Sequence, residues 1–536
     1  MIRWIGILLA SLALQGQELK IQILCTTDMH GAVMAEDAYT LQPVAKGWAK
    51  TATLIRELKA RNPHTLLVDC GDTIQGEPSS YVRARLHPEL PEPSMAIMNA
   101  LGYHAMTVGN HDFDWGQTTL RKAEEQASFP WLGANVLLTA TGKPAFAPYA
   151  VVDVGGAKVG ILGLTTSGMS RIADAGNLEG LRIQDAVETA RLLVPLLRDK
   201  EKVDVVVVAF HGGLGTPDAA LFEENQALSL AEKVPGIDLV LCGHTHEALS
   251  TRHKGVPIVQ AQAQGRALGV VELILNKEKG HWKVTASETR LVRPTLETPL
   301  DAQVLESTAA LRKLTDDYLN THATQLAVDL DGRWSRMEDS TVMQLLHTVQ
   351  RKAVGAQLSA AFSPSTGYFV PKGPTSIRQY WALMPYENKV ARIRITGLQV
   401  KLWLEHAARY YNFSHLPQLV NRDVAGFDFD MIDGVAYSLD LSKPLGQRVV
   451  DLKFQGQPVK ETQTFTLALN SYRLTGGGGY LAAIHFKGQA ELVNPTSLRN
   501  LLFEYVLGQP TLNLSLTEKW HIIPALDRER VLVQVK

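Results

Sequence analysis

The chain has 536 residues, of which 45% are hydrophobic, 20% charged and 7% aromatic. This ordinary globular composition excludes a disordered chain, a collagen-like repeat and a polytopic membrane protein, and the length indicates about two to four domains. The 53 Lys and Arg residues almost balance the 54 Asp and Glu residues, so the formal net charge of -1 gives no global positive field to hold polymeric nucleic acid. Three cysteines cannot form a disulfide framework, and we expect them to be small buried side chains.

The first 17 residues have the pattern of a cleavable secretory signal. Arg3 supplies a positive start, residues 4–14 form an apolar run too short to span a bilayer, and small and polar residues follow. The alternatives are a buried first strand or an uncleaved anchor. Since no later stretch reaches about 18 apolar residues, we expect secretion to a bacterial periplasm or the medium, without stable membrane insertion after cleavage.

Residues 18–297 alternate short β-branched apolar runs with helical patterns. The runs at residues 203–210 and 237–242 are fully apolar, which is typical of strands covered on both faces. We therefore predict an α/β layered domain here. The other predicted strands cover residues 21–25, 66–70 and 105–108, and the predicted helices cover residues 54–60 and 94–101.

The pattern changes after residue 297. Val304, Leu311, Leu314 and Tyr318 fall on one helical face, so residues 298–329 are predicted to form a connecting helix and linker. Residues 330–536 are predicted to form a second, α+β domain. Its expected helix covers residues 398–411, and its expected strands cover residues 435–441, 449–454 and 465–469.

Five polar clusters stand where predicted strands of the first domain end. The carboxyl ends of strands are where α/β sheets place their sites, and five such coincidences are strong evidence for one shared site. Residues two apart at a strand end point the same way, so both can ligate one cation. The clusters contain Asp28 and His30, then Asp72, then Asn110 with His111 and Asp114, then His211, and finally His244 and His246.

The side chains in these clusters suit two metal ions. Carboxylate, amide oxygen and imidazole favour Zn, Mn, Fe or Co over Ca, and Asp72 is the natural bridging carboxylate. Two cations about 3.5–4 Å apart can clamp the oxygens of a phosphoryl transfer and lower the pKa of a bound water. His111 is a poor ligand because Asn110 beside it takes that role. We expect it to be a cation facing the phosphate or leaving oxygen, with Asp114 holding its other nitrogen.

The order D-x-H, G-D, G-N-H-x, H-G-G and G-H-T-H resembles the calcineurin-like metallophosphoesterases. The segment G-N-H-D-F-D at residues 109–114 is similar to the G-N-H-E-F-D of the 5'-nucleotidase branch, which implies that His111 and Asp114 form a catalytic dyad. Asp112 stands where that branch often has Glu. The resemblance implies that one metal is held by Asp28, His30, Asp72 and His246, and the other by Asp72, Asn110, His211 and His244.

The second half of the chain resembles the 5'-nucleotidase C-terminal domain, in which two aromatic rings sandwich a nucleobase. Tyr386 and Tyr472 fall on those two motif positions, and a glycine loop that includes Gly477 and Gly478 follows Tyr472. Glycines permit close backbone approach to a ligand. By itself, however, a glycine run is more often a flexible turn and a lone tyrosine a filler residue.

Two departures point to a subgroup. The 5'-nucleotidases commonly read N-G-G-D-G, with the Asp holding the ribose, whereas Gly478 replaces that Asp here. They also carry a G-G-I-R segment whose Arg holds the phosphate, whereas residues 360–364 read A-A-F-S-P. Arg336 is a candidate remaining phosphate contact, with a solvated surface charge as the alternative. The segments at residues 470–477 and 427–435 instead resemble the bifunctional 2',3'-cyclic-nucleotide 2'-phosphodiesterase/3'-nucleotidases.

The resemblance implies a fold and a function. We expect a metallophosphoesterase domain built as a β-sandwich flanked by helices, then the connecting helix, then the 5'-nucleotidase-type domain. The expected protein is a secreted monomer with two divalent metal ions that converts 2',3'-cyclic nucleotides to 3'-nucleotides and then to nucleosides plus phosphate. The alternatives are a 5'-nucleotidase or nucleotide-sugar hydrolase, and, in another class, a catalytically inactive nucleotide-binding protein.

Overall fold

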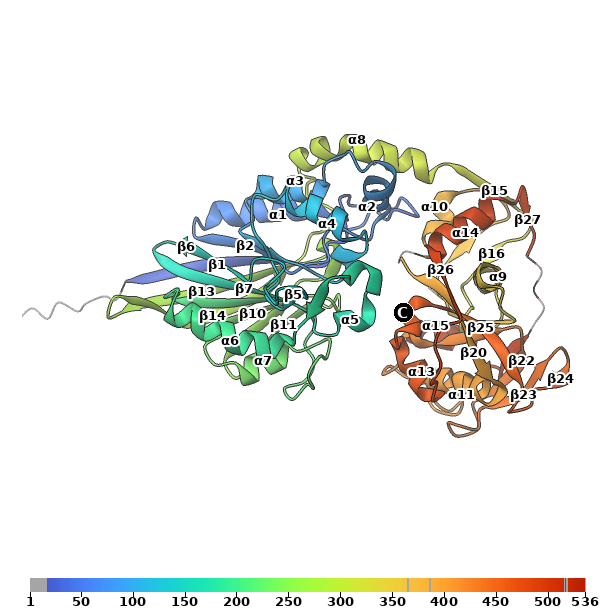
Figure 1. The fold of residues 1–536 in the computed structure, drawn as a ribbon. Helices are drawn as coiled ribbons and strands as arrows, with labels where there is room; N and C mark the ends of the chain where they lie inside the picture. Colours follow the sequence, from blue (N-terminus) through green and yellow to red (C-terminus); the bar gives the residue numbers. More distant parts are fainter. Residues whose placement is uncertain (1–16, 364–365, 385–386, 515, 517–518, 536) are drawn as a thin grey trace, which may run out of the picture. The chain divides into compact units, whose positions relative to one another are not determined.

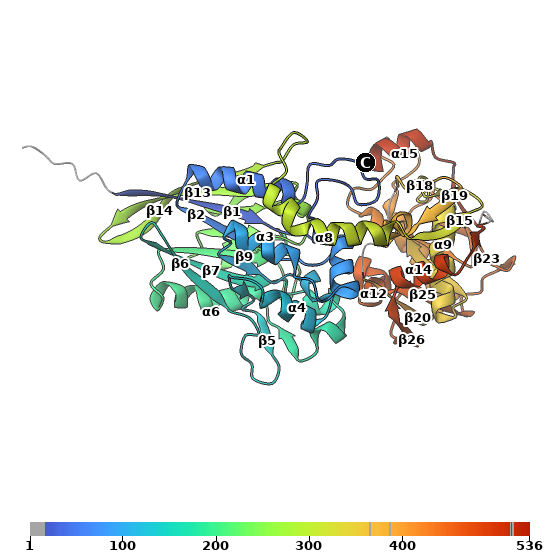
Figure 2. The same ribbon diagram turned by 90° about the horizontal axis from the view of Figure 1, so that it is seen from above.

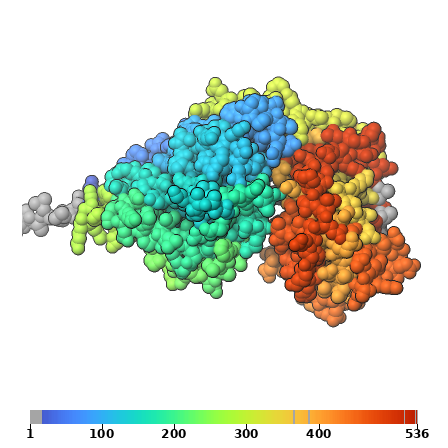
Figure 3. Space-filling model, in the orientation of Figure 1, coloured from blue at the N-terminus to red at the C-terminus, as the bar shows by residue number. Residues whose placement is uncertain are grey.

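The computed structural model describes residues 17–363, 366–384, 387–514, 516 and 519–535. Almost all of the predicted signal segment therefore lies outside the described residues, and strand β1 begins at Glu18. The chain divides into two compact units, each a closely packed body in the space-filling view (Figure 3). Unit 1 holds the chain up to Glu36, Gln42–Gln75 and His87–Ala309, and unit 2 holds Asp37–Leu41, Gly76–Leu86 and the chain from Ala310. The boundary at residues 309 and 310 falls inside helix α8 (Ala302–Leu319), within the predicted connector.

Unit 1 is a sandwich of two six-stranded sheets with helices on its outer faces (Figures 1 and 2). The first sheet has the order β14 (His281–Val292), β13 (Leu268–Glu278), β1 (Glu18–Thr26), β2 (Thr65–Asp69), β3 (Ala105–Thr107), β4 (Trp131–Leu132). The second has the order β11 (Leu249–His253), β12 (Val256–Gln260), β10 (Leu239–Cys242), β9 (Val205–His211), β7 (Ala157–Thr165), β6 (Tyr149–Val154). This confirms the predicted α/β layered fold.

The apolar strands are buried on both faces, as their sequences indicate. In β9, Val205 and Val207 pack into the layer between the sheets, while Val206 and Val208 pack against the helices outside. Side chains two apart on a strand share a face, so a strand covered on both sides must be apolar throughout. The helices of the first sheet are α1 (Trp48–Arg61), α3 (Pro93–Leu101) and α4 (Gln117–Glu124), and those of the second are α6 (Ala186–Asp199) and α7 (Ala227–Lys233).

Strand register gathers the polar loops at one end of the sandwich. Strands β1, β2 and β3 are parallel neighbours in one sheet, and β9 and β10 are parallel neighbours in the other. The sheets meet at these strand ends, because Thr107 Oγ1 donates to the Ala209 carbonyl at 3.0 Å and His211 Nδ1 lies 2.7 Å from the Cys70 carbonyl. The loops after all five strands therefore lie side by side.

Unit 2 is an α+β domain. Its main sheet has the order β21 (Asp430–Asp433), β17 (Leu358–Phe362), β25 (Thr464–Asn470), β20 (Lys389–Thr396), β26 (Leu492–Ser497). A second sheet has the order β24 (Gln457–Pro458), β23 (Val449–Phe454), β22 (Ala436–Asp440), β28 (Trp520–Ile523), and a smaller one has β19 (Gly373–Ser376), β15 (His322–Leu326), β27 (Thr511–Leu512). The principal helices are α9 (Thr341–Val354), α11 (Gly397–Ala407) and α14 (Leu498–Leu507).

Two segments of unit 2 differ from their predicted form. The helix expected over residues 398–411 ends at Ala407 and tightens into a 3₁₀ turn over Ala408–Tyr410. The expected glycine loop contains the short helix α12 (Ser471–Leu474) and a 3₁₀ turn over Gly477–Gly479. The Asn470 side chain starts α12 by accepting a hydrogen bond from the Arg473 amide at 2.9 Å, which is the capping role that Asn favours.

Two general expectations can be compared with the described residues. Cys25, Cys70 and Cys242 are buried and free, as the composition predicted. Within the described part of the chain, no helix is both long enough and apolar enough to cross a membrane.

Candidate metal centre

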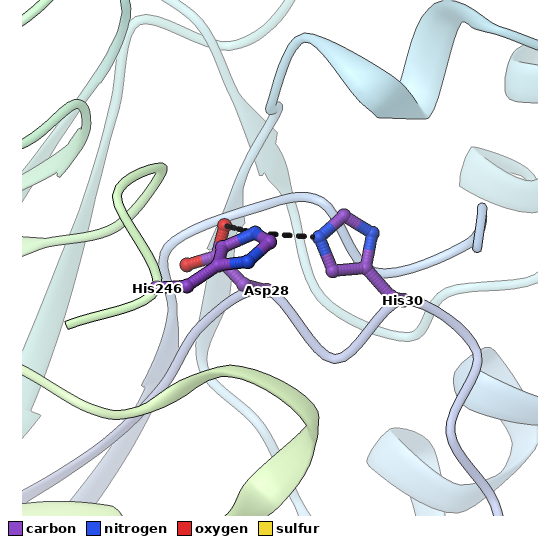
Figure 4. A group of neighbouring side chains, drawn as sticks. All are labelled: Asp28, His30 and His246. Atoms are coloured by element: carbon purple, nitrogen blue, oxygen red, sulfur yellow. Dashed lines mark hydrogen bonds and ion pairs between the residues drawn. The ribbon is translucent and has the colours of Figure 1, made fainter. Parts of the chain in front are cut away.

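The first group of metal-ligating side chains joins the loop after β1 to the loop after β10. Asp28, His30 and His246 present ligand atoms that all lie within 4.8 Å of one another. His30 Nε2 lies 3.0 Å from His246 Nε2, and His246 Nε2 lies 3.6 Å from Asp28 Oδ1 (Figure 4). Two ligands each about 2.0–2.1 Å from one zinc-sized ion lie roughly 3 Å apart, so the spacing fits a shared cation.

The second group lies beside the first. Asp72, His211 and His244 again present ligand atoms within 4.8 Å of one another. His211 Nε2 lies 3.0 Å from Asn110 Oδ1, which adds the amide oxygen that the sequence predicted. The groups are adjacent because the His244 amide donates to the Asp28 carboxylate at 3.0 Å.

Hydrogen bonds orient the imidazoles toward a cation. His30 Nδ1 lies 2.7 Å from the Gln75 carbonyl, and His211 Nδ1 lies 2.7 Å from the Cys70 carbonyl. A carbonyl can only accept, so each Nδ1 carries a proton, and Nε2 is the ring nitrogen left to ligate a cation. Asp72 Oδ2 is buried and receives no hydrogen bond from the described residues, although His211 Nε2 lies 3.2 Å away. These imidazole nitrogens and carboxylate oxygens are therefore suitable ligands for a divalent cation.

The electrostatics of the cluster favour added positive charge. Burial lowers the pKa of His30 to about 4, which keeps that ring neutral. Burial alone would raise the pKa of Asp72, but the nearby His211 and His111 hold it well below its usual range. Burial would lower the pKa of His211, yet Asp72 raises it to about 9. The cluster thus holds an ionised carboxylate in the protein interior, where it needs cationic partners.

Backbone strain marks the same loops. Five of the predicted ligands have left-handed backbone conformations, which side chains other than glycine rarely adopt and which cost on the order of 1 kcal/mol each. Hydrogen bonds between the loops hold this strain: the Asp28 amide donates to the Gly71 carbonyl and the His30 amide to the Asp72 carbonyl, both at 2.8 Å. The strained ligands are Asp28, His30, Asp72, His244 and His246.

Asp112 anchors the site, a role that the sequence analysis missed. Its fully buried carboxylate accepts hydrogen bonds from the amides of Gly109 at 2.8 Å, Asp72 at 3.0 Å, Thr73 at 2.9 Å and Ile74 at 3.1 Å. These bonds tie the loop after β2 to the loop after β3 and fix the backbone that carries Asp72. The sequence signal for this role is the acid inside the G-N-H-x motif. The four amides that bind the acid come together only when the chain folds.

Glu224 is a second residue that the sequence analysis did not identify. Its carboxylate lies 3.2 Å from His244 Nε2, and this hydrogen bond lowers the pKa of Glu224. It lies in the segment before α7, where no local sequence pattern distinguishes it from a surface acid.

His111 stands beside the ligand groups with its ring held by Asp114. His111 Nδ1 lies 2.8 Å from Asp114 Oδ2, and the His111 ring centroid lies 5.5 Å from that of His30. Burial would lower the pKa of His111, but Asp114 and Asp72 raise it to about 10. The side chain is 27% exposed, and it belongs to neither ligand group in the described residues. The arrangement therefore presents a protonated imidazole next to the metal ligands.

The predicted substrate residues lie in unit 2. Tyr386 lies outside the described residues. Tyr472 is in α12, and a Cβ placed on Gly477 would lie 2.4 Å from its ring. Arg336 packs against Tyr410, to whose hydroxyl its Nη1 donates at 3.2 Å, so it is a partly enclosed side chain rather than a freely solvated charge.

Comparisons with known proteins match both halves of the chain. Residues 21–248 match the calcineurin-like phosphoesterase family, and residues 320–484 match the 5'-nucleotidase C-terminal domain. The chain is 30% identical to a 2',3'-cyclic-nucleotide 2'-phosphodiesterase/3'-nucleotidase of Yersinia enterocolitica over 86% of this chain and 82% of that relative. It is 29% identical to a trifunctional nucleotide phosphoesterase protein of Bacillus subtilis over 95% of this chain, which spans 39% of that relative.

A solved structure shows the same fold. The putative 5'-nucleotidase of Staphylococcus aureus has a TM-score of 0.82 and 22% identity, over 94% of this chain and 100% of that one. The chain therefore belongs to the calcineurin-like phosphoesterases that carry a 5'-nucleotidase C-terminal domain, and it is a metal-dependent phosphoester hydrolase. Within this class it is similar to the 2',3'-cyclic-nucleotide 2'-phosphodiesterase/3'-nucleotidases, as the sequence motifs predicted.

The ligand assignment predicts how metal content responds to substitution. If Asp72 bridges both cations, Asp72→Asn lowers the content of both, whereas His246→Ala mainly lowers one. Metal analysis of the purified proteins checks this, with Glu288→Gln on the exposed edge of β14 as a charge-matched control. A chelator should abolish activity, and Mn or Co should restore it. Full metal content in Asp72→Asn, or full turnover in a stripped, chelator-treated sample, would contradict the assignment.

Proposed function

We propose that the protein is a dinuclear metal-dependent phosphohydrolase that opens 2',3'-cyclic nucleotides to 3'-nucleotides and then removes the 3'-phosphate. The observation that carries this proposal is the pair of adjacent ligand groups with the His111–Asp114 pair beside them. The named activity of the Yersinia enterocolitica relative supports the choice of substrate. Small nucleotides, rather than polymeric nucleic acid, are the proposed partners.

Seven side chains would hold two divalent ions, drawn from Zn, Mn, Fe and Co. In this proposal Asp72 would bridge the two ions, and the Nε2 atoms of His30 and His211, whose Nδ1 atoms face carbonyls, suit these metals. When bound, the ions supply Lewis-acid charge at the phosphoryl group and acidify water. The ligands are Asp28, His30, Asp72 and His246 for one ion, and Asp72, Asn110, His211 and His244 for the other.

His111 is the proposed proton donor to the leaving oxygen. In the first reaction the oxygen of water bonds to phosphorus, the bond from phosphorus to O2' breaks, and O2' takes a proton. In the second, the oxygen of another water bonds to phosphorus, the bond from phosphorus to O3' breaks, and O3' takes a proton, which leaves inorganic phosphate and the nucleoside. Asp114 holds Nδ1 of His111, so the ring stays protonated and Nε2 is the nitrogen that would donate the proton.

The base is held in unit 2 in this proposal. Tyr472, together with Tyr386, would stack on the nucleobase, and the glycines after Tyr472 would bring the backbone close to the nucleoside. Arg336 would contact the phosphate. Because any base has a π-face, the site should tolerate all four bases.

The rival function is that of a 5'-nucleotidase or nucleotide-sugar hydrolase. Residues 360–364 read Ala-Ala-Phe-Ser-Pro and lack the arginine that would hold a 5'-phosphate. Phe362 lies against the buried Arg473, with 5.6 Å between the guanidinium carbon and the ring centroid. A panel of 2',3'-cyclic AMP, 3'-AMP, 5'-AMP and UDP-glucose separates the two functions. Turnover mainly of the first two supports the proposal, and a preference for 5'-AMP or UDP-glucose establishes the rival. Absence of turnover on every substrate with metals bound would indicate the inactive nucleotide-binding protein.

We also propose that the protein acts outside the cytoplasm, after removal of residues 1–17. The support is the charge and hydropathy pattern of that segment. N-terminal sequencing of the protein recovered from the periplasm or medium tests it, and retention of Met1 in the cell pellet would contradict it.

Loss of the proton donor should slow the reaction without releasing metal. His111→Asn should lower kcat by about 10²–10⁴-fold, the range for a positioned general acid. Its metal content should stay near that of the wild type, because His111 belongs to neither ligand group. His87→Asn, a partly exposed histidine outside the site, is the control and should keep full activity. Loss of metal from His111→Asn would show that His111 is a ligand.

Loss of a stacking ring should affect nucleotides alone. Stacking contributes about 1–3 kcal/mol per base, so Tyr472→Ala and Tyr386→Ala should each raise KM for 3'-AMP by roughly 10-fold or more. Hydrolysis of a small aryl phosphate should stay nearly unchanged, because it needs only the metals and His111. Tyr505→Ala, a half-buried tyrosine elsewhere in unit 2, is the matched control. Parallel loss of both activities with a lower melting temperature would mean that the tyrosine is a core residue.

A further inference from the structure

Asp428 is held beside the Tyr472 segment by a buried arginine. Arg473 Nη1 donates to Asp428 Oδ1 at 2.9 Å, and Arg473 itself is 1% exposed. The rest of the guanidinium is fixed, because Arg473 Nη2 donates to Asp430 Oδ1 at 2.8 Å and to the Phe427 carbonyl at 2.5 Å. The carboxylate of Asp428 is therefore placed on a rigid support.

Asp428 and Asp430 differ in what they leave for a ligand. Asp430 is fully buried, and both of its oxygens bind protein donors: Oδ1 binds Arg473, and Oδ2 binds the Trp403 indole at 3.1 Å. The side chain of Asp428 is 20% exposed. Only its Oδ1 accepts a side-chain hydrogen bond within the described part of the chain. Asp430 thus completes the core, whereas Asp428 presents carboxylate lone pairs to the surface.

The glycine run places this carboxylate close to the Tyr472 ring. A Cβ on Gly477 would lie 2.4 Å from the ring, and a Cβ on Gly478 would lie 2.5 Å from Asp428 Oδ1. Gly477 therefore packs against the aromatic ring and the adjacent Gly478 packs against the carboxylate, and a side chain at either position would displace the group beside it. His406 Nε2, 2.7 Å from the Gly478 carbonyl, fixes this path.

We propose that Asp428 accepts a hydrogen bond from a sugar hydroxyl of the nucleotide whose base stacks on Tyr472. This inference rests on the proposed function, in which the base lies on that ring. A carboxylate only accepts hydrogen bonds, and a hydroxyl is the donor that the sugar offers. The same negative charge repels a phosphate group, so the hydroxyl at Asp428 is one that the substrate carries unesterified. A substrate with its phosphate on O3' has two candidates, the 2'- and the 5'-hydroxyl.

The test pairs substitutions at Asp428 with substrates that lack one hydroxyl. Wild type, Asp428→Asn and Asp428→Ala are assayed on 3'-AMP, on its 2'-deoxy and 5'-deoxy analogues, and on an aryl phosphate. Hydrogen bonds to a charged group contribute about 1.5–3 kcal/mol, so Asp428→Ala should lower kcat/KM for 3'-AMP by about 10-fold or more, mainly through KM. Aryl phosphate hydrolysis should not change. Glu461→Ala, an exposed acid of unit 2, is the charge-matched control and should have no effect on either substrate.

The analogues identify the hydroxyl and decide the outcome. With the wild-type enzyme, kcat/KM for one of the two analogues should be lower than kcat/KM for 3'-AMP by about the same factor that Asp428→Ala causes on 3'-AMP. On that analogue, Asp428→Ala should lower kcat/KM no further. Equal losses on all three nucleotides would overturn the inference. If both variants hydrolyse the aryl phosphate more slowly and also melt at a lower temperature, Asp428 is a structural partner of Arg473. That outcome would also overturn the inference.

Failure of the proposed function has a different signature. In that case wild type prefers 5'-AMP over 3'-AMP, and the same comparison is made with the 2'-deoxy and 3'-deoxy forms of 5'-AMP. Asp428 is then tested on the substrate that the enzyme turns over.

Discussion

Two carboxylates with no exposed surface, Asp28 and Asp72, are the constraint on which the rest of unit 1 depends. An ionised carboxylate in the interior is costly unless cationic or hydrogen-bonding partners surround it. Four imidazoles, several backbone amides and left-handed loop conformations are arranged around these two groups. The apolar sandwich is rigid enough to hold that strain, because strands such as β9 are packed on both faces. A cation between the ligand groups would balance the charge that this arrangement concentrates.

In the proposed function, catalysis and substrate recognition belong to different units of one chain. The candidate metal ligands and the His111–Asp114 pair follow strand ends of unit 1, whereas Tyr472, Arg473 and Asp428 belong to unit 2. The chain links these functions directly, since the segment that follows Gln75 in the ligand loop, Gly76–Leu86, belongs to unit 2. There the Tyr81 ring packs against Trp381, with centroids 5.1 Å apart, and beneath the Arg499 guanidinium. The loop that ends at Gln75, beside the candidate metal ligands, is thus covalently continuous with unit 2.

The sequence predicted those features that depend on local pattern and strand order. Apolar runs identified β2, β9 and β10 to within two residues, and parallel strands that end in polar residues had to bring Asp28, Asp72 and His211 together. It could not predict which acids complete the loops. Asp112 acquires its role from amides of another loop, and Glu224 and Asp428 acquire theirs from histidine and arginine side chains distant in sequence. The 3₁₀ turn at Gly477–Gly479 likewise depends on tertiary contacts of the glycine run.

The glycine at position 478 has a physical explanation once Asp428 is considered. The 5'-nucleotidases, which this half of the chain resembles, commonly place an acid at that position. Here an acid at 478 would have its Cβ 2.5 Å from Asp428 Oδ1 and 2.6 Å from Arg473 Nη1, so the two acids exclude each other sterically as well as by charge. Gly478 also has a φ of 68°, which glycine adopts without strain. The carboxylate beside the Tyr472 segment is therefore that of Asp428, two residues before β21, instead of one in the glycine run. Arg473 binds both the Asp428 carboxylate and the core residue Asp430, so the position of the Asp428 carboxylate is fixed by the fold of the domain rather than by a loop.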